Sequence, residues 1–298
     1  MSVNMSDLIK ELREKSGAGM LDCKKALAET GNDIEKAIDW LRKKGLAVAN
    51  KKSDRVTSEG LVCVAKNDTY AVVLEVNSET DFVGRNEQFQ TFVKNLANVA
   101  LNGAESIEDL KSKKYDGVKT VEEVLVSLIA TIGENLSIRR VERINIAGKI
   151  AYSYIHNAIA DNIGKIGVLV VLNATPKNEA LGRQLAMHIA ASTPKALNIA
   201  ELDKDLVERE MSVQKDLAKQ SGKPDNIIEK MLEGRLSKFY QEVVLLEQPF
   251  VMDPDKKVQK ILQENAVDIL QYKMFILGEG IVKEVKDFAQ EVADTLKN

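Results

Sequence analysis

One short loop combines an apolar ring with a carboxylate. Residues 77–83, Asn-Ser-Glu-Thr-Asp-Phe-Val, join a hydrophobic stretch to the predicted start of a helix. Loops of this kind lie on the surface of a rigid scaffold, where binding residues collect. Phe82 beside Asp81 could wedge into an apolar pocket of another protein and bring a charge with it. Spacing alone favours a simpler interpretation, in which the Phe82 ring folds under the loop and packs on its own core.

Arrangements typical of catalysis are missing from the sequence. The histidines, His156 and His188, and the cysteines, Cys23 and Cys63, do not have the spacing of a metal site. There is no glycine-rich phosphate loop, no dinucleotide fingerprint and no recognisable nucleophile motif. His188 is more simply explained as a packed or surface residue than as a ligand. We therefore expect no enzymatic activity, no bound metal and no cofactor.

The composition is that of an ordinary globular protein. The chain has 298 residues, 44% of them hydrophobic and 29% charged, with a net charge of −3. This length suits two or three domains, and the acidic balance gives no support for duplex binding. Neither a signal peptide nor an apolar run of the ~20 residues needed to span a bilayer is found. Two cysteines are typical of a reducing compartment. We expect a soluble, cytoplasmic protein with no membrane partner and no direct nucleic-acid partner.

Residues 1–54 predict a module of three helices followed by a linker. Ser6 is expected to cap the first helix, and Asn32 to begin the third with a capping box. Residues 43–45, Lys-Lys-Gly, are expected to close the third helix, with cations at the negative end of its dipole. Residues 50–55 are then the linker. The module resembles the ubiquitin-associated type.

Residues 55–145 and 146–280 predict two related core subdomains, each a β-hairpin followed by a helix. In the first, β-rich runs over 61–64 and 70–76 pair through a turn at Asn67. Further elements are expected as helices from Asn86, over 121–132 and over 179–191, and as strands from Leu136, over 150–155 and over 167–172.

Residues 203–246 interrupt this pattern with two helices joined by a Gly-Pro turn. They are expected to form an antiparallel hairpin with a narrow, coiled-coil-like seam that includes Val213 and Leu217. Strands are expected over 250–252 and 270–277. A C-terminal helix is expected over 281–298. The fold class is therefore α+β.

Several segments resemble, in order, the signature sequences of the elongation factor Ts family. They are residues 12–27, 74–83, 132–140, 186–191 and 248–252. Several long matches in series cover nearly the whole chain and are far more specific than one short motif. Leu21 stands where many members have Met, and Glu79 stands where a neutral Gln is common, which adds charge near the loop tip. Residues 102–120 vary within the family, and no role is assigned to them.

The resemblance implies a guanine-nucleotide exchange factor for elongation factor Tu, which it would bind both with GDP and without nucleotide. One implied contact is a loop that displaces Mg²⁺, formed by Thr80, Asp81, Phe82 and Val83. Two other contacts are implied. Met20, Leu21 and Lys24 would grip a helix of the partner's G domain. The helix that carries His188 would contact the side of the G domain nearer its phosphate loop. For Met20 and Leu21, simple packing inside the three-helix core is equally compatible with the sequence.

Two other functions stay open at this point. Residues 6–45 could serve an adaptor of the ubiquitin-associated type that binds the ribosome or a nascent chain. RNA binding would use lysines 43, 44, 51 and 52, which are more simply explained as solvated charges. The helical hairpin could serve self-association or reach the partner, and the sequence does not decide between these roles.

Overall fold

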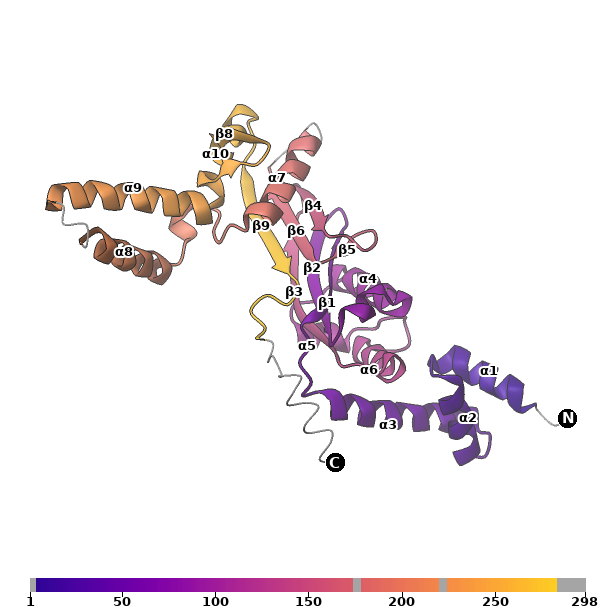
Figure 1. Ribbon diagram of the computed structural model, residues 1–298. Helices are drawn as coiled ribbons and strands as arrows, with labels where there is room; N and C mark the ends of the chain where they lie inside the picture. The colour runs from indigo at the N-terminus through magenta and orange to yellow at the C-terminus, as the bar shows by residue number, and fades with distance from the viewer. Residues whose placement is uncertain (1–3, 174–177, 220–223, 283–298) are drawn as a thin grey trace, which may run out of the picture.

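The computed structural model describes residues 4–173, 178–219 and 224–282, and the fold is α+β, as the sequence predicts. Figure 1 shows a central body of sheets and helices, with a three-helix module and a helical hairpin at opposite ends. Within the described ranges, no helix is both long and apolar enough to cross a membrane.

The N-terminal module consists of α1 (Met5–Ser16), α2 (Met20–Glu29) and α3 (Ile34–Lys52). Its core is Leu12, Cys23, Ala26, Leu27 and Ala37. The predicted caps are one or two residues out of place. Asn4, not Ser6, caps α1, and Asp33, not Asn32, caps α3 by accepting from the Lys36 N–H. Asn32 has φ 66°, a left-handed turn conformation that precedes the helix.

The predicted end of the third helix at Gly45 is wrong, because α3 continues to Lys52. Gly45 is buried against α6 (Val121–Ile132), and a Cβ added there would lie 3.4 Å from the Val126 side chain. The missing side chain lets the two helices approach closely, and this contact outweighs the weak helix preference of glycine. The first half of the expected linker, residues 50–52, is therefore the last turn of α3.

The first sheet has the strand order β3-β2-β1-β5. Its antiparallel hairpin, β1 (Glu59–Lys66) and β2 (Tyr70–Ser78), turns at Asn67 as predicted, with the Asn67 Oδ1 accepting from the backbone N–H of Thr69 and Tyr70. β3 (Leu136–Asn145) pairs with β2, and β5 (Ile163–Gly164) pairs with β1. One face packs against α4 (Glu87–Leu101) and α6 in the largest hydrophobic core.

The 102–120 segment contains a short helix that the sequence did not predict, α5 (Ile107–Ser112). Ser106 caps it by accepting from the Asp109 N–H, and Leu110 anchors it in the core. The helix thus packs beside α6 and β3.

The second sheet has the order β4-β6-β9, all antiparallel, from β4 (Ile150–His156), β6 (Ile166–Leu172) and β9 (Ile269–Ile276). α7 (Glu179–Ser192) and α10 (Val258–Glu264) pack on its outer face. The inner faces of the two sheets meet in a separate core that includes Val73, Leu169 and Phe275. Both faces of the central strands are buried, which explains their unbroken apolar runs.

The predicted hairpin is present as α8 (Lys204–Lys219) and α9 (Asp225–Val243), which run antiparallel away from the body (Figure 1). Its base is a small core with Ala196, Leu202 and Val244. The predicted seam is partly wrong, because Val213 and Leu217 are half exposed. The C-terminal helix predicted over 281–298 lies almost entirely outside the described residues.

Candidate functional site

The loop of residues 79–85 is held between two rigid elements. β2 ends at Ser78, a 3-10 turn (η1, Asp81–Arg85) follows, and α4 begins directly after Asn86. The Asn86 side chain caps α4 by accepting from the N–H groups of Gln88 and Phe89, at 2.9 and 3.1 Å. The loop therefore has fixed entry and exit points, as a rigid binding element requires.

Phe82 points away from the protein, with 76% of its surface exposed. Asp81 is also exposed. The simpler interpretation, a ring packed under its own loop, is therefore wrong. Val83 is only 4% exposed and belongs to the core beneath the sheet, so it anchors the loop and its side chain is not free for a partner. The tip that can meet another molecule is Asp81 and Phe82.

The stem of the loop is attached to the turn between α6 and β3. The Glu134 carboxylate accepts two hydrogen bonds from Thr80, one from its backbone N–H (2.9 Å) and one from its hydroxyl (2.6 Å). Glu79 accepts from the Asn135 N–H (2.6 Å) and pairs with Arg55 (3.4 Å). The charge of Glu79 thus faces back into the stem, and the expectation that it adds charge near the tip is wrong.

A second exposed apolar surface lies on α2. Met20 is 59% exposed and Leu21 is 81% exposed, while Lys24 follows one turn later and is also exposed. Cys23 and its neighbours on the other face fill the module core. Packing of Met20 and Leu21 inside the three-helix core, the alternative left open by the sequence, is therefore wrong.

His188, expected at the partner surface, is fully buried. Its Nε2 lies 3.0 Å from the Gln248 Oε1, and its Nδ1 accepts from the Val251 N–H at 3.2 Å. Burial lowers the pKa of the ring despite the opposing hydrogen bond to Gln248, so the neutral ring fits a donor on one nitrogen and an acceptor on the other. His188 therefore cannot contact a partner directly.

The role of His188 is to support the turn at residues 251–252. Val251 and Met252 are 47% and 44% exposed, and they link β7 (Pro249–Phe250) to β8 (Asp253–Lys257). The sequence predicted a single strand over 250–252, but the chain turns back after Phe250. Sequence reasoning found this segment as a motif and missed its exposed apolar pair.

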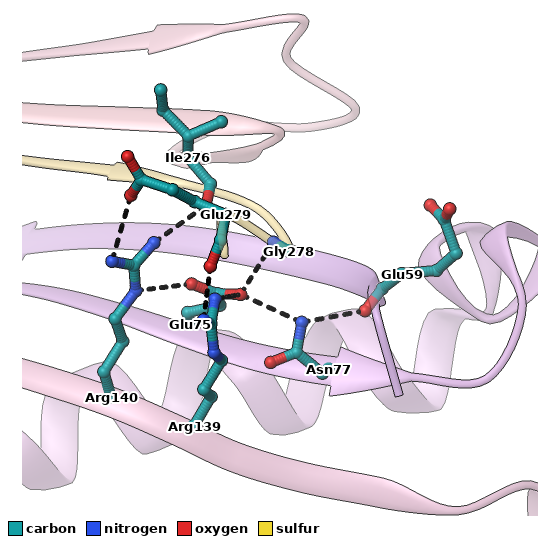
Figure 2. A network of polar contacts seen from close by, with 8 residues as sticks. All are labelled: Glu59, Glu75, Asn77, Arg139, Arg140, Ile276, Gly278 and Glu279. Carbon is teal, nitrogen blue, oxygen red and sulfur yellow. Dashed lines mark hydrogen bonds and ion pairs between the residues drawn. The ribbon is translucent and has the colours of Figure 1, made fainter. Parts of the chain in front are cut away.

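A buried ion-pair network surrounds Glu75 of β2 (Figure 2). The Glu75 carboxylate is fully buried and pairs with Arg139 (3.0 Å) and Arg140 (2.6 Å), while the Gly278 N–H donates to it at 2.9 Å. Arg140 also donates to the Ile276 carbonyl at 2.8 Å. Burial alone would raise the pKa of Glu75, but these hydrogen bonds outweigh it and the net shift is downward. The network therefore joins β2 and β3 to the end of β9.

Charged and aromatic side chains are exposed on the loop of residues 79–85. Among the residues that the structure describes, no group of three or more His, Cys, Asp or Glu could hold a metal ion. The exposed groups at the loop are the Phe82 ring, the Asp81 carboxylate and the Arg85 side chain. Exposed aromatic and charged side chains of this kind are suited to contact with another protein.

Several known proteins with similar sequences are named Elongation factor Ts. The sequence model of a family described as Elongation factor TS matches residues 79–279. Curated relatives named Elongation factor Ts include those of Gluconobacter oxydans (51% identical over 289 residues, 96% of each chain) and Rhodospirillum centenum (52% over 297 residues, 96% of each chain). That of Bartonella tribocorum is 49% identical over 307 residues and covers 100% of each chain.

Proposed function

The chain belongs to the elongation factor Ts family of translation elongation factors, and from this premise we propose that it is a guanine-nucleotide exchange factor. It binds elongation factor Tu with GDP, displaces Mg²⁺ and leaves Tu free of nucleotide. No covalent bond is made or broken, so the activity is a change of binding equilibrium rather than enzymatic turnover of a substrate. The observation that carries this proposal is the outward Phe82 beside Asp81 on a loop with fixed ends.

Asp81 and Phe82 have different tasks in this mechanism. A G protein holds GDP through a phosphate-binding loop and a Mg²⁺ ion that neutralises phosphate charge. Phe82 enters an apolar pocket between helices of the G domain, and Asp81 disturbs the water and side-chain network around the ion. Loss of the ion leaves phosphate charge without compensation, which favours release.

The energies involved are compatible with one wedge assisted by a wider interface. Factor and nucleotide weaken each other's binding reciprocally. A thousandfold weakening of GDP binding requires about 4 kcal/mol of differential binding. Burial of one aromatic side chain supplies ~1.5–3 kcal/mol. Phe82 therefore accounts for a large part, and other contacts must supply the rest.

Two further surfaces supply those contacts in this proposal. Met20, Leu21 and Lys24 bind a helix of the G domain from the N-terminal module. The turn at Val251 and Met252, which His188 supports from within, binds the side nearer the phosphate loop. Both surfaces present exposed apolar side chains, which are otherwise kept in small patches on monomeric proteins.

Release of fluorescent GDP from elongation factor Tu tests the function. At fixed millimolar Mg²⁺, the protein is expected to raise the release rate by at least about tenfold, which corresponds to ~1.4 kcal/mol. When a chelator has already removed Mg²⁺, the acceleration should be smaller, because displacing the ion is part of the work. No acceleration under either condition would refute exchange. An equal acceleration factor under both conditions would refute the Mg²⁺ step alone.

The α2 surface has its own test. The double variant Met20→Ala, Leu21→Ala is expected to raise the concentration of factor needed for half-maximal GDP release by roughly ten- to a hundredfold, because two exposed side chains lose their burial. Circular dichroism should stay unchanged, since neither residue belongs to the module core. Met5→Ala, at a less exposed apolar residue of the same module, is the control. A double variant that titrates like the original protein would remove α2 from the interface.

One alternative is an adaptor that uses residues 6–45 to bind the ribosome or a nascent chain. The exposed α2 surface fits it equally well, but the loop of Phe82 would then have no task. Sedimentation with purified ribosomes, set against binding to elongation factor Tu, separates the two. The proposal places the protein in the cytoplasm. It includes neither self-association through the hairpin nor direct RNA binding.

A further inference from the structure

We propose that Glu134 is a positioning residue that holds the Asp81–Phe82 tip in its outward conformation before the partner arrives, a role that rests on the proposed exchange function. Glu134 is 54 positions from Thr80 in the chain, yet its carboxylate accepts both the N–H and the hydroxyl of that residue. It is half-buried, and both of its carboxylate oxygens are engaged by Thr80. Its effect on exchange is therefore expected to pass through Thr80.

Thr80 is the residue at which the loop leaves the sheet. It stands at the N-cap position of η1, where a threonine hydroxyl commonly accepts a backbone N–H, but this cap bond is not formed. The hydroxyl donates instead to the Glu134 Oε1 at 2.6 Å. The Thr80 carbonyl accepts from the Ser78 hydroxyl at 2.8 Å. The N–H, the hydroxyl and the carbonyl of Thr80 are thus all hydrogen-bonded, to Glu134 or to Ser78. Asp81 is the next residue.

The attachment is reciprocal. While Glu134 accepts from Thr80, the neighbouring Asn135 donates its N–H to the Glu79 Oε1 at 2.6 Å. Glu79 and Thr80 of the loop stem are therefore hydrogen-bonded to Asn135 and Glu134 of the α6–β3 turn, respectively. Three of these bonds involve a carboxylate, and hydrogen bonds to charged groups are about twice as strong as neutral ones.

The turn that carries Glu134 is itself held by hydrogen bonds to the end of α3 and to Arg55. It lies between α6 and β3, and Asn135 is 8% exposed. The Asn135 side chain donates to the Arg55 carbonyl at 2.9 Å, and Lys52 at the end of α3 donates to the Gly133 carbonyl. This one turn therefore contacts both the loop of residues 79–85 and the end of α3, the last helix of the N-terminal module. Preorganisation of this kind removes the cost of ordering the loop at the moment of binding.

The geometry also distinguishes a carboxylate from its amide. Both oxygens of Glu134 accept, which matches two donors on Thr80. In Glu134→Gln, one acceptor becomes an NH₂ donor. The Thr80 hydroxyl can rotate and accept from it, but its N–H cannot, so the amide retains one good arrangement. We therefore expect Glu134→Gln to weaken the positioning of the loop in part and Glu134→Ala to abolish it.

The experiment compares four proteins: the original chain, Glu134→Ala, Phe82→Ala and the double variant. At saturating factor, Glu134→Ala is expected to slow GDP release from elongation factor Tu about tenfold, the factor that corresponds to one charge-assisted hydrogen bond. In the Phe82→Ala background, the same change should slow release by a smaller factor, because only Asp81 is left for Glu134 to position. Glu142→Ala is the matched control, a carboxylate on β3 whose exposed pair with Lys273 is remote from the loop.

Hydrogen exchange of the free protein gives a readout that does not depend on exchange activity. The backbone amides of residues 79–85 should exchange faster in Glu134→Ala and in Thr80→Val than in the original protein. Their exchange rates should be unchanged in Glu142→Ala. If the original protein fails to release GDP, the proposed function is wrong and this measurement still judges the positioning role. Unchanged protection in Glu134→Ala would overturn the role. An equal loss of rate with and without Phe82 would also overturn it.

Discussion

Phe82→Ala is expected to slow the stimulated release of GDP from elongation factor Tu by roughly 10- to 100-fold, the factor that corresponds to ~1.5–3 kcal/mol of lost aromatic burial. The ring is 76% exposed in the free protein, so its removal should leave the free energy of unfolding unchanged. The effect should persist at saturating factor, because the wedge acts after the partners have met. Stopped-flow release of fluorescent GDP at several concentrations of factor measures both the rate and its saturation.

Val118→Ala is the matched control for Phe82. Val118 is also 76% exposed, and it lies in the loop that precedes α6 rather than beside the wedge. We expect it to exchange nucleotide at the original rate. If Phe82→Ala also kept that rate, the loop would have to act through Asp81 or through its backbone, and the wedge mechanism would be wrong.

Glu75→Ala is expected to lower the free energy of unfolding by about 3 kcal/mol at pH 7. The change leaves two arginines without their shared carboxylate and the Gly278 N–H without its acceptor (Figure 2). Breaking a buried ion pair by removing one partner costs about 3–5 kcal/mol. Arg139 and Arg140 are 27% and 28% exposed, so water can partly replace the carboxylate and the lower end of that range applies. Urea unfolding followed by circular dichroism measures the loss.

The stabilisation by Glu75 has a defined pH dependence. Its hydrogen bonds lower the pKa of the folded state below the ordinary value of 4.5, so the charged carboxylate stabilises the fold above pH 4.5. This contribution is lost as the pH falls from 4.5 through the lowered pKa. The difference between the original protein and Glu75→Ala should therefore narrow in acid. Glu142→Ala, which removes an exposed ion pair, should cost less than about 1 kcal/mol at any pH.

A loss of under about 1 kcal/mol for Glu75→Ala would mean that the network does not join the two sheets. Such a result would also mean that the network does not hold residues 276–282, the last described residues, against β2 and β3. Exchange activity gives an independent view. Glu75 touches neither the loop tip nor α2, so at low temperature, where the variant stays folded, we expect GDP release close to the original rate.

Several elements followed from local rules and were therefore predictable. The hairpin turn at Asn67, the cap at Asn86 and the helix over 121–132 depend on side chains within four residues of one another. The α3 helix shows where such rules fail. Its local end signal at residues 43–45 is sound, but the contact of Gly45 with Val126, some 80 positions away, decides that the helix continues.

The site divides in the same way. Sequence motifs identified residues 74–83 and 248–252, and the match to known proteins confirmed the family. They did not reveal what holds either segment. Glu134 and Asn135 were noticed only as part of a motif, and their partners lie 54 and 56 positions away. Spacing along one chain carries no information about such pairs when only a single sequence is read.

The sequence by itself determined the family, the α+β class and the identity of the loop, because these depend on residue types in order. Only the tertiary structure decided which of the predicted contact residues are exposed: Phe82 points outward, while Val83 and His188 point inward. A side chain is buried only when surfaces from distant parts of the chain close over it, and periodicity cannot specify those surfaces. Val83 and its neighbours fill the core under the sheet, and the Phe82 ring lies outside it.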